Sequence, residues 1–268
     1  MPVNTDLPAD PDESKDRNFV TALARGLDVL RCFRPNETDL TNTDISERTG
    51  LPKPTVSRLT HTLCKLDYLV ANPQTGTYRL SAGVLQLGYG VLSGMDIGDR
   101  AADAMRALRD GPNSYITCAL AERHRMDAIY IAVQKSREEI ALSMHVGSRL
   151  PLFHSAIGRA ILVGMSAQDR AAAFDLAKQL APDEEEARQR SFERAQAEYD
   201  SLGYCTGYGD WRADVNGIAV PVFSLNGARV YGLNVGGPSF HVKKKQLEGY
   251  YASKLIQAAK ALSCRPQG

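Results

Sequence analysis

Residues Thr41–Leu80 read TNTDISERTGLPKPTVSRLTHTLCKLDYLVANPQTGTYRL, and this stretch decides the fold of the amino-terminal part of the chain. Thr41 and Asp44 have the spacing of a capping box, in which a hydroxyl and a carboxylate bind the free amides at the start of a helix. Gly50 is expected to end that short helix, because glycine readily adopts the left-handed conformation of a helix terminus. Leu51-Pro52 then leaves room only for a sharp turn into the next helix.

A second helix is predicted from about Pro54 to Leu66, since a proline is tolerated in the first helical turn. Its apolar residues recur at helical spacing and predict one buried stripe, which consists of Val56, Leu59, Leu63 and Leu66. The opposite face carries hydroxyls and cations, which can bind phosphates, and Arg58 can donate two hydrogen bonds to a guanine edge. The DNA contacts predicted for the two helices are Thr41, Thr43, Lys53, Pro54, Thr55, Ser57, Arg58, His61 and Lys65.

A β-hairpin is predicted after the second helix, with strands at 68–71 and 77–80 around the turn-forming residues 72–76. This hairpin is the wing of a winged helix-turn-helix, and Gln74, Thr75 and Arg79 are predicted to lie near phosphates or the minor groove. Residues 48–80 are locally basic, because five cations, including Arg48, against Asp67 alone leave a net charge of +4. The alternative is a helix-turn-helix that serves packing or dimerisation and presents an ordinary solvated face.

The composition fits a soluble globular protein with two domains: 268 residues, 43% hydrophobic and 24% charged. A net charge of +1 excludes a polycation that coats nucleic acid or membranes. The five cysteines include no C-x-x-C pair, so we expect reduced thiols and a cytoplasmic protein. The sequence shows no signal peptide, and no apolar run approaches the ~18 residues of a membrane span.

The segments around the winged helix-turn-helix complete the amino-terminal part. Residues 1–17 are acidic and proline-rich and are predicted to be a disordered tail. A helix over 21–34, with Leu23, Leu27, Leu30 and Phe33 on one stripe, is predicted to complete a DNA-binding domain over 18–80. Ser81 is expected to cap a linker helix over 81–97, whose broad apolar band indicates pairing with a second subunit. The alternative is a helix packed only on its own domain.

The carboxy-terminal part, residues 98–268, predicts an antiparallel sheet with helices on its flanks, which gives an α+β protein overall. Such a domain suits a small-molecule sensor. Strands are expected at 115–121, 128–133 and 140–145, and again at 218–223 and 230–235 around Asn226-Gly227, a strong hairpin signal. Helices are expected at 101–108 and 153–165, then two more that include the charged segment 183–200, and finally at 242–262; residues 203–210 are expected to be irregular.

Seven segments, in this order along the chain, resemble the IclR family of bacterial transcriptional regulators. Single motifs of this kind are weak indicators, but their shared order is specific. They cover nearly all of the chain after the tail, and they are ALARGLDVLRCF, ISERTGLPKPTVSRLTHTLCKLDYL, YRLSAGVLQLG, RLPLFHSAIGRAIL, GYCTGYGDW, GIAVPVF and VYGLNVGGP.

The resemblance implies a winged helix-turn-helix joined by a linker helix to a GAF-like effector-binding domain. It also implies homodimers formed through the amino-terminal part and tetramers, as dimers of dimers, on operator DNA. Asn234 and Gly236 stand where many members have serines that hold a small carboxylate, and Asp67 and Ser46 replace a usual glycine and alanine. Carried over by position, the effector pocket comprises Met144, His145, Leu152, His154, Ser155, Gly158, Asp210, Ile218, Val220, Asn234 and Gly236.

The leading hypothesis is a ligand-responsive regulator of a catabolic operon that binds double-stranded operator DNA and senses a small aromatic or aliphatic acid. Amides at the start of the 153–165 helix could hold the acid's anionic group. The alternative roles are structural histidines for His145 and His154 and a turn residue for Asp210. An enzyme is disfavoured, because no G-x-S-x-G, H-E-x-x-H or phosphate-binding loop is present, and His61 with Cys64 lacks further zinc ligands. No catalytic residue, metal or cofactor is therefore expected, and a ligand-free interaction scaffold is the third possibility.

Overall fold

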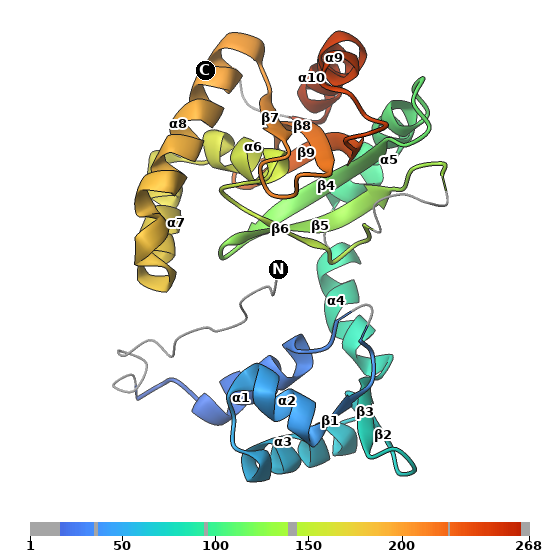
Figure 1. Ribbon diagram of the computed structural model, residues 1–268, viewed down its shortest axis with the longest axis vertical. Helices are drawn as coiled ribbons and strands as arrows, with labels where there is room; N and C mark the ends of the chain where they lie inside the picture. The colour runs from blue at the N-terminus through green and yellow to red at the C-terminus, as the bar shows by residue number, and fades with distance from the viewer. Residues whose placement is uncertain (1–16, 35–36, 94–95, 139–143, 225, 264–268) are drawn as a thin grey trace. The chain divides into compact units, whose positions relative to one another are not determined.

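The computed structural model describes residues 17–34, 37–93, 96–138, 144–224 and 226–263. The chain divides into two compact units, an N-terminal unit up to Gly94 and a C-terminal unit from Met95 onward. Both are drawn in Figure 1, and each is described here by itself. The described residues contain no helix that combines the length and the apolar character needed to cross a membrane.

The N-terminal unit is a three-helix core with a small antiparallel sheet of order β1-β3-β2 (Figure 1). Most of its buried core consists of residues from α1, α2, α3 and β2, namely Val29, Ile45, Val56, Leu63 and Leu69. The elements are α1 (Thr21–Arg31), β1 (Leu40–Thr41), α2 (Asn42–Thr49), α3 (Lys53–Lys65), β2 (Leu69–Asn72), β3 (Thr77–Leu80) and α4 (Gly83–Ser93).

The predicted helix signals of this unit are confirmed. The Thr41 hydroxyl accepts a hydrogen bond from the Asp44 amide at 3.2 Å, and the Asp44 carboxylate accepts one from the Thr41 amide at 2.7 Å. Gly50 ends α2 with φ of 66°. Asp67 has φ of 58°, a conformation that aspartate tolerates better than most residues. The short turn between α2 and α3 follows from these local interactions.

Three details of this unit were predicted wrongly. Leu66 is 58% exposed, because α3 ends at Lys65 and the helical spacing no longer applies beyond it, whereas Thr60 is buried. Leu23 and Leu27 are exposed, because only the carboxy-terminal half of α1 contacts the core. Arg48 does not add to a free basic surface, since it binds the Glu37 carboxylate at 2.7 Å and the Cys32 carbonyl at 3.0 Å.

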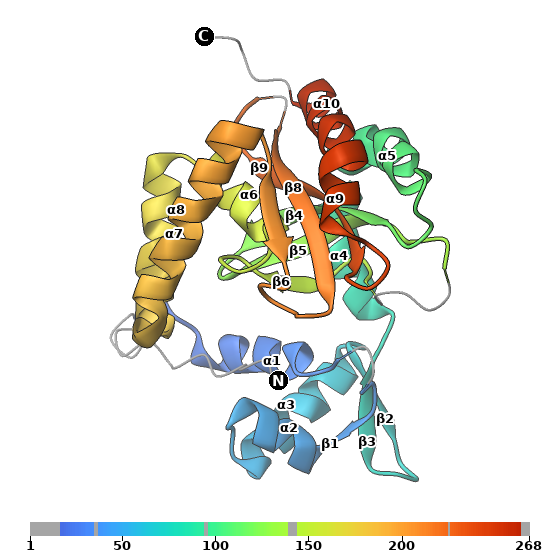
Figure 2. The same ribbon diagram turned by 45° about the horizontal axis from the view of Figure 1, so that its top comes forward.

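The C-terminal unit is built on a six-stranded antiparallel sheet of order β6-β5-β4-β9-β8-β7. Figure 2 shows α6, α7 and α8 on one side of this sheet and α5 and α10 on the other. The elements are α5 (Asp96–Arg109), β4 (Thr117–His124), β5 (Asp127–Gln134), β6 (Arg149–Pro151), α6 (Ala156–Gly164), α7 (Ala167–Leu180), η1 (Pro182–Glu184), α8 (Glu185–Leu202), β7 (Cys205–Tyr208), β8 (Val215–Phe223), β9 (Val230–Pro238), α9 (Lys244–Gln246), the π-helical η2 (Leu247–Tyr251) and α10 (Ala252–Leu262).

Alternation along the strands gives the sheet two buried faces. Cys118, Ile218 and Leu233 point toward α5 and α10 and belong to one core cluster. Ala119 and Ala219 point to the other side, where α6 and its neighbours cover the sheet. The second face is lined with small residues, and this brings α6 close: a Cβ atom on Gly232 would lie 2.6 Å from Ile157 Cγ1.

Three predicted boundaries of this unit need correction. Of the strand expected at 140–145, residues 140–143 lie outside the described residues. Met144 and His145 are described and are not in a strand, and the third strand is β6 instead. The helix expected from Phe153 begins at Ala156, because Ser155 caps it. Residues 203–210 are not irregular throughout, because β7 lies in this segment and pairs with β8. The pairing is a long-range contact, and the glycines of the segment predict an irregular structure instead.

Candidate DNA-binding face and effector cavity

The exposed face of α3 carries the predicted base-reading residue. Among the described residues, the Arg58 guanidinium and the Lys53 and Lys65 ammonium groups have no ion pair or hydrogen bond in the unit. Thr60 is buried on the other side of the helix and hydrogen-bonds the Asn42 side chain at 3.2 Å, which ties α3 to α2. The helix therefore holds its cations toward solvent, where a phosphate or a base edge could bind them.

The other DNA-binding candidates divide into exposed and occupied side chains. Thr41 is half-buried and its hydroxyl serves the capping box, and Thr55 is half-buried at the start of α3. In the wing, the Asn72 side chain accepts from the Gln74 amide at 3.0 Å and the Asn72 carbonyl accepts from the Gly76 amide at 2.9 Å, which fixes the turn. The exposed candidates are Thr43, Lys53, Pro54, Ser57, Arg58, His61, Lys65, Gln74, Thr75 and Arg79.

The helix α4 exposes an apolar surface. Leu85, Leu87 and Tyr89 are 74%, 55% and 70% exposed, although each has a large side chain that water solvates poorly. Ser81 accepts a hydrogen bond from the Gly83 amide at 3.0 Å, in line with its predicted capping role, while α4 itself extends from Gly83 to Ser93 and is shorter than the predicted 81–97. The exposed residues Val20, Leu23 and Leu27 at α1 belong to the same unit.

A cavity of about 30 Å³ lies in the C-terminal unit, between the start of α6 and the sheet. By the same measure, one water molecule needs roughly 10–15 Å³. None of the described residues that line it carries a charge. The lining residues are Thr117, Tyr130, Met144, Leu150, Ser155, Ala156, Ile157, Gly207, Trp211, Val215, Asn216, Gly217, Asn234, Gly236 and Gly237.

The polar groups of this cavity differ in how far the protein satisfies them. The Ser155 hydroxyl donates to the Pro151 carbonyl at 2.7 Å and accepts from the Gly158 amide at 3.1 Å, so it is occupied by its capping role. The Asn234 amide nitrogen donates to the Tyr130 hydroxyl at 3.3 Å. The Asn234 Oδ1 atom is buried and has no hydrogen-bond partner.

The structure brings together only part of the predicted effector residues. Gly158 is buried within α6 and Leu152 is buried beside it, so that a Cβ atom on Gly158 would lie 2.1 Å from the Leu152 carbonyl oxygen. Ile218 and Val220 point to the opposite face of the sheet, and Val220 lines a separate groove of about 460 Å³. Four of the predicted effector residues line the cavity, namely Met144, Ser155, Asn234 and Gly236. The cavity wall does not include the predicted residues His145, His154 and Asp210.

His154 and Asp210 lie in a charged environment outside the cavity. Burial lowers the pKa of His154 despite the opposing effect of the Glu184 carboxylate, which lies 3.9 Å away. Burial by itself raises the pKa of Asp210. The hydrogen bond and positive charge of Arg159, together with Arg194, outweigh this effect and leave that pKa below its usual value.

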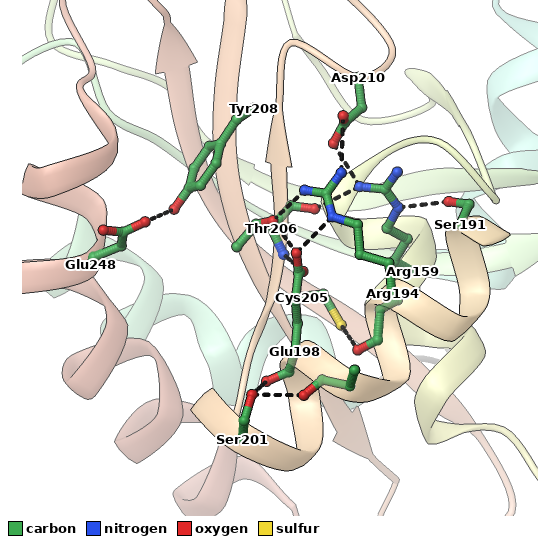
Figure 3. Close-up of polar contacts among 12 residues, drawn as sticks. Arg159, Ser191, Arg194, Glu198, Ser201, Cys205, Thr206, Tyr208, Asp210 and Glu248 are labelled. Atoms are coloured by element: carbon green, nitrogen blue, oxygen red, sulfur yellow. Dashed lines mark hydrogen bonds and ion pairs between the residues drawn. The ribbon is translucent and has the colours of Figure 1, made fainter.

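A polar network centred on Arg159 joins α6, α8 and β7 (Figure 3). The Arg159 side chain is 5% exposed, and its guanidinium binds the Asp210 carboxylate at 2.6 Å, the Thr206 carbonyl at 2.9 Å and the Ser191 hydroxyl at 2.9 Å. Arg194 binds the same carboxylate at 3.3 Å. This network fixes the segment that follows β7 and contains Trp211, a residue of the cavity wall.

Sequence reasoning missed Tyr130, Thr117 and Trp211 among the lining residues. The alternation of β5 could have placed Tyr130 on the same face as Ala128. Its approach to Asn234 on β9 depends on the register of three strands, which no local pattern reveals.

Two family models match the chain. The model described as the IclR helix-turn-helix domain matches residues 22–73, and the one described as the bacterial transcriptional regulator IclR C-terminal matches residues 89–264. The HTH-type transcriptional regulator TsaQ1/TsaQ2 of Comamonas testosteroni is 34% identical over 234 residues, which cover 85% of this chain and 83% of that protein.

Solved structures show the same fold. An IclR family transcriptional regulator from Brucella abortus superposes with a TM-score of 0.79 at 39% identity, covering 95% of this chain and 96% of the other. An IclR homologue from Microbacterium hydrocarbonoxydans, complexed with 4-hydroxybenzoate, superposes with a TM-score of 0.65 at 23% identity, covering 90% of this chain and 99% of the other. The chain belongs to the IclR family of transcriptional regulators, with an N-terminal helix-turn-helix domain and a C-terminal effector-binding domain.

Proposed function

We propose that this protein is a cytoplasmic, non-enzymatic regulator of a catabolic operon, which binds operator DNA through α3 and the wing and senses a small organic acid in the cavity beside α6. The proposed domains are residues 18–80 for DNA binding, 81–97 for the linker helix and 98–268 for effector binding, with 1–17 as a tail. The observation that carries this proposal is that the cations of α3 are exposed and have no partner within the described part of the chain.

The DNA-binding part rests on side-chain exposure and charge. Arg58, Lys53 and Lys65 reach solvent from one helix, while Gln74 and Arg79 are exposed on the wing. Base edges are read in the major groove by such a helix, and phosphate contacts fix its orientation. Arg58 reads a base in this arrangement, and the remaining exposed residues contact the backbone.

The oligomeric part rests on α4. Leu85, Leu87 and Tyr89 present an apolar surface that pairing with a second copy would remove from water. A homodimer formed there places two α3 helices on two half-sites, and two dimers form the tetramer on the operator. Replacement of Leu85 by Glu should raise the monomer fraction measured by light scattering, whereas replacement of the neighbouring Gln86 by Glu should not. Identical oligomers for both variants would contradict this interface.

The sensing part rests on the cavity. Met144, Ser155, Asn234 and Gly236 line it, and it lies at the amino end of α6, where the helix dipole favours an anionic group. A protein of the same fold is complexed with 4-hydroxybenzoate, a small aromatic acid. The cavity measures about 30 Å³, and we expect its walls to move when an acid enters.

Fluorescence anisotropy tests the proposal. Labelled DNA from immediately upstream of this chain's own gene is titrated with protein at two salt concentrations, with and without a panel of aliphatic and aromatic acids. We expect salt-sensitive binding that exceeds binding to random DNA and that at least one acid shifts. Binding no tighter than to random DNA would contradict the regulator, and turnover of an acid would indicate an enzyme. Specific binding that ignores every acid would contradict the sensor alone and favour the ligand-free scaffold.

A further inference from the structure

Asn234 and Tyr130 form a donor and acceptor pair at the cavity that the fold leaves incomplete. The Asn234 Oδ1 atom is buried without a partner, although a buried amide oxygen normally accepts at least one hydrogen bond. The Tyr130 hydroxyl accepts from Asn234 at 3.3 Å, and among the described residues its own proton has no acceptor. The cavity therefore presents one free acceptor beside one free donor.

The sheet is built so that these two side chains meet. Asn234 on β9 lies between Ala119 of β4 and Ala219 of β8, two neighbours too small to reach it with a polar group. Tyr130 on β5 pairs with Ala121 of β4, and it reaches across β4 to the Asn234 amide. Because Ala119 and Ala121 of β4 are small, they leave room on this face of the sheet next to Asn234 and Tyr130.

The electrostatic character of the cavity limits what the pair can bind. The described lining residues carry no charge, so no cationic side chain among them lies next to Asn234 Oδ1 to neutralise an ionised group at that atom. Burial raises the pKa of Tyr130, which keeps the phenol protonated and able to donate. An anion facing Oδ1 would meet an acceptor, whereas a neutral hydroxyl can donate to Oδ1 and accept from the phenol.

We propose that Asn234 and Tyr130 bind a hydroxyl group of the effector, so that this protein senses a hydroxylated organic acid and discriminates against the acid that lacks the hydroxyl. The inference rests on the proposed effector cavity and names the chemical class of its ligand. The hydroxyl of the effector donates to Asn234 Oδ1 and accepts the Tyr130 proton. The acid that lacks the hydroxyl leaves both buried groups unpaired, which is the basis of strong discrimination in such sites.

Calorimetric titration of the full-length protein tests this with acids that differ only in the hydroxyl: 4-hydroxybenzoate and 3-hydroxybenzoate against benzoate, and 3-hydroxybutyrate against butyrate. We expect at least one hydroxylated acid to bind about tenfold tighter than its partner, or more. Tyr130→Phe and Asn234→Leu should bring that ratio close to one while they retain binding of the unhydroxylated acid. Tyr231→Phe, on the other face of β9, is the control and should keep the wild-type ratio.

A second measurement separates recognition from a structural role. If the pair serves the ligand, Asn234→Leu should change the melting temperature of the free protein by only about 2 °C or less, because the fold does not satisfy Oδ1. A much larger drop would show that the pair holds the fold together, for example through a buried water, and would overturn the inference. Equal binding of both members of every pair would overturn it and leave the acid sensor standing. Absence of binding by any acid would overturn the sensor and the inference together.

Discussion

The cations of α3 in the N-terminal unit and the buried arginines of α6 and α8 in the C-terminal unit have opposite surroundings. In the N-terminal unit, Lys53, Arg58 and Lys65 extend from α3 into solvent without a partner among the described residues. In the C-terminal unit, Arg159 is buried among a carboxylate, a carbonyl and a hydroxyl, and Arg188 is buried against the Ala177 and Ala181 carbonyls. The cavity at the start of α6 is lined, as far as the chain is described, by uncharged residues.

This difference shows how one residue type serves two purposes. An exposed cation costs the fold little and remains available to a polyanion such as DNA. A buried cation must be fully hydrogen-bonded, so its charge is used inside the protein and stabilises one arrangement of the surrounding elements. We therefore expect substitutions in the first group to affect binding and substitutions in the second to affect stability.

Removal of the buried cation should have the largest effect on stability. Arg159→Met leaves the Asp210 carboxylate with Arg194 as its remaining partner and removes the hydrogen bonds to Thr206 and Ser191. We expect a loss of about 3 kcal/mol in the free energy of unfolding, measured by urea denaturation. Arg190→Met, which removes an exposed ion pair with Glu186, should cost less than about 0.5 kcal/mol. Equal costs for the two variants would contradict the contrast between buried and exposed cations.

A second stability prediction concerns how closely α6 packs on the segment before it. Gly158→Ala should cost about 1–3 kcal/mol, because the added methyl group would overlap the Leu152 backbone and displace α6. Gly98→Ala in α5 meets nothing within 4 Å and should stabilise the protein by about 1 kcal/mol through helix propensity. Thermal unfolding of both variants measures this. A neutral Gly158→Ala would mean that α6 does not pack as described.

Local interactions explain why the N-terminal unit was predicted from sequence more fully than the cavity. The capping box at Thr41 and the glycine at position 50 act within a few residues, and both are confirmed. Strand β7 depends on pairing with β8, and Gly207 within it packs against Ala156, whereas its glycine-rich sequence by itself predicts an irregular loop. Tyr130 and Asn234 meet only through the register of three strands, and no spacing in the sequence encodes that contact.

The Asp210 carboxylate gives a smaller expected stability effect than Arg159, and its effect depends on pH. Its folded pKa lies below the usual value, so it stabilises the protein above the unfolded carboxyl pKa of about 4, and this contribution is lost as the pH falls through the folded value. Unfolding curves from pH 7 to pH 3 should show a loss that is about 1 kcal/mol larger for the wild type than for Asp210→Asn.

The exposed pair of Asp214 and Arg212 provides the control for that measurement, because the pKa of Asp214 is also lowered but by a hydrogen bond at the surface. Asp214→Asn should therefore follow the wild-type curve more closely than Asp210→Asn does. If Asp214→Asn altered the pH dependence more than Asp210→Asn, the buried network would not be the source of the acid sensitivity.

The most direct test of the central claim is the operator affinity of Arg58→Ala, measured by fluorescence anisotropy beside Arg106→Ala, which removes an exposed arginine of the C-terminal unit. If the exposed cations of α3 contact DNA, Arg58→Ala should weaken operator binding about tenfold or more and leave the melting temperature unchanged, while Arg106→Ala binds like the wild type. Arg58→Ala protein that is folded and binds the operator as tightly as Arg106→Ala would contradict the assignment of α3 as the recognition helix.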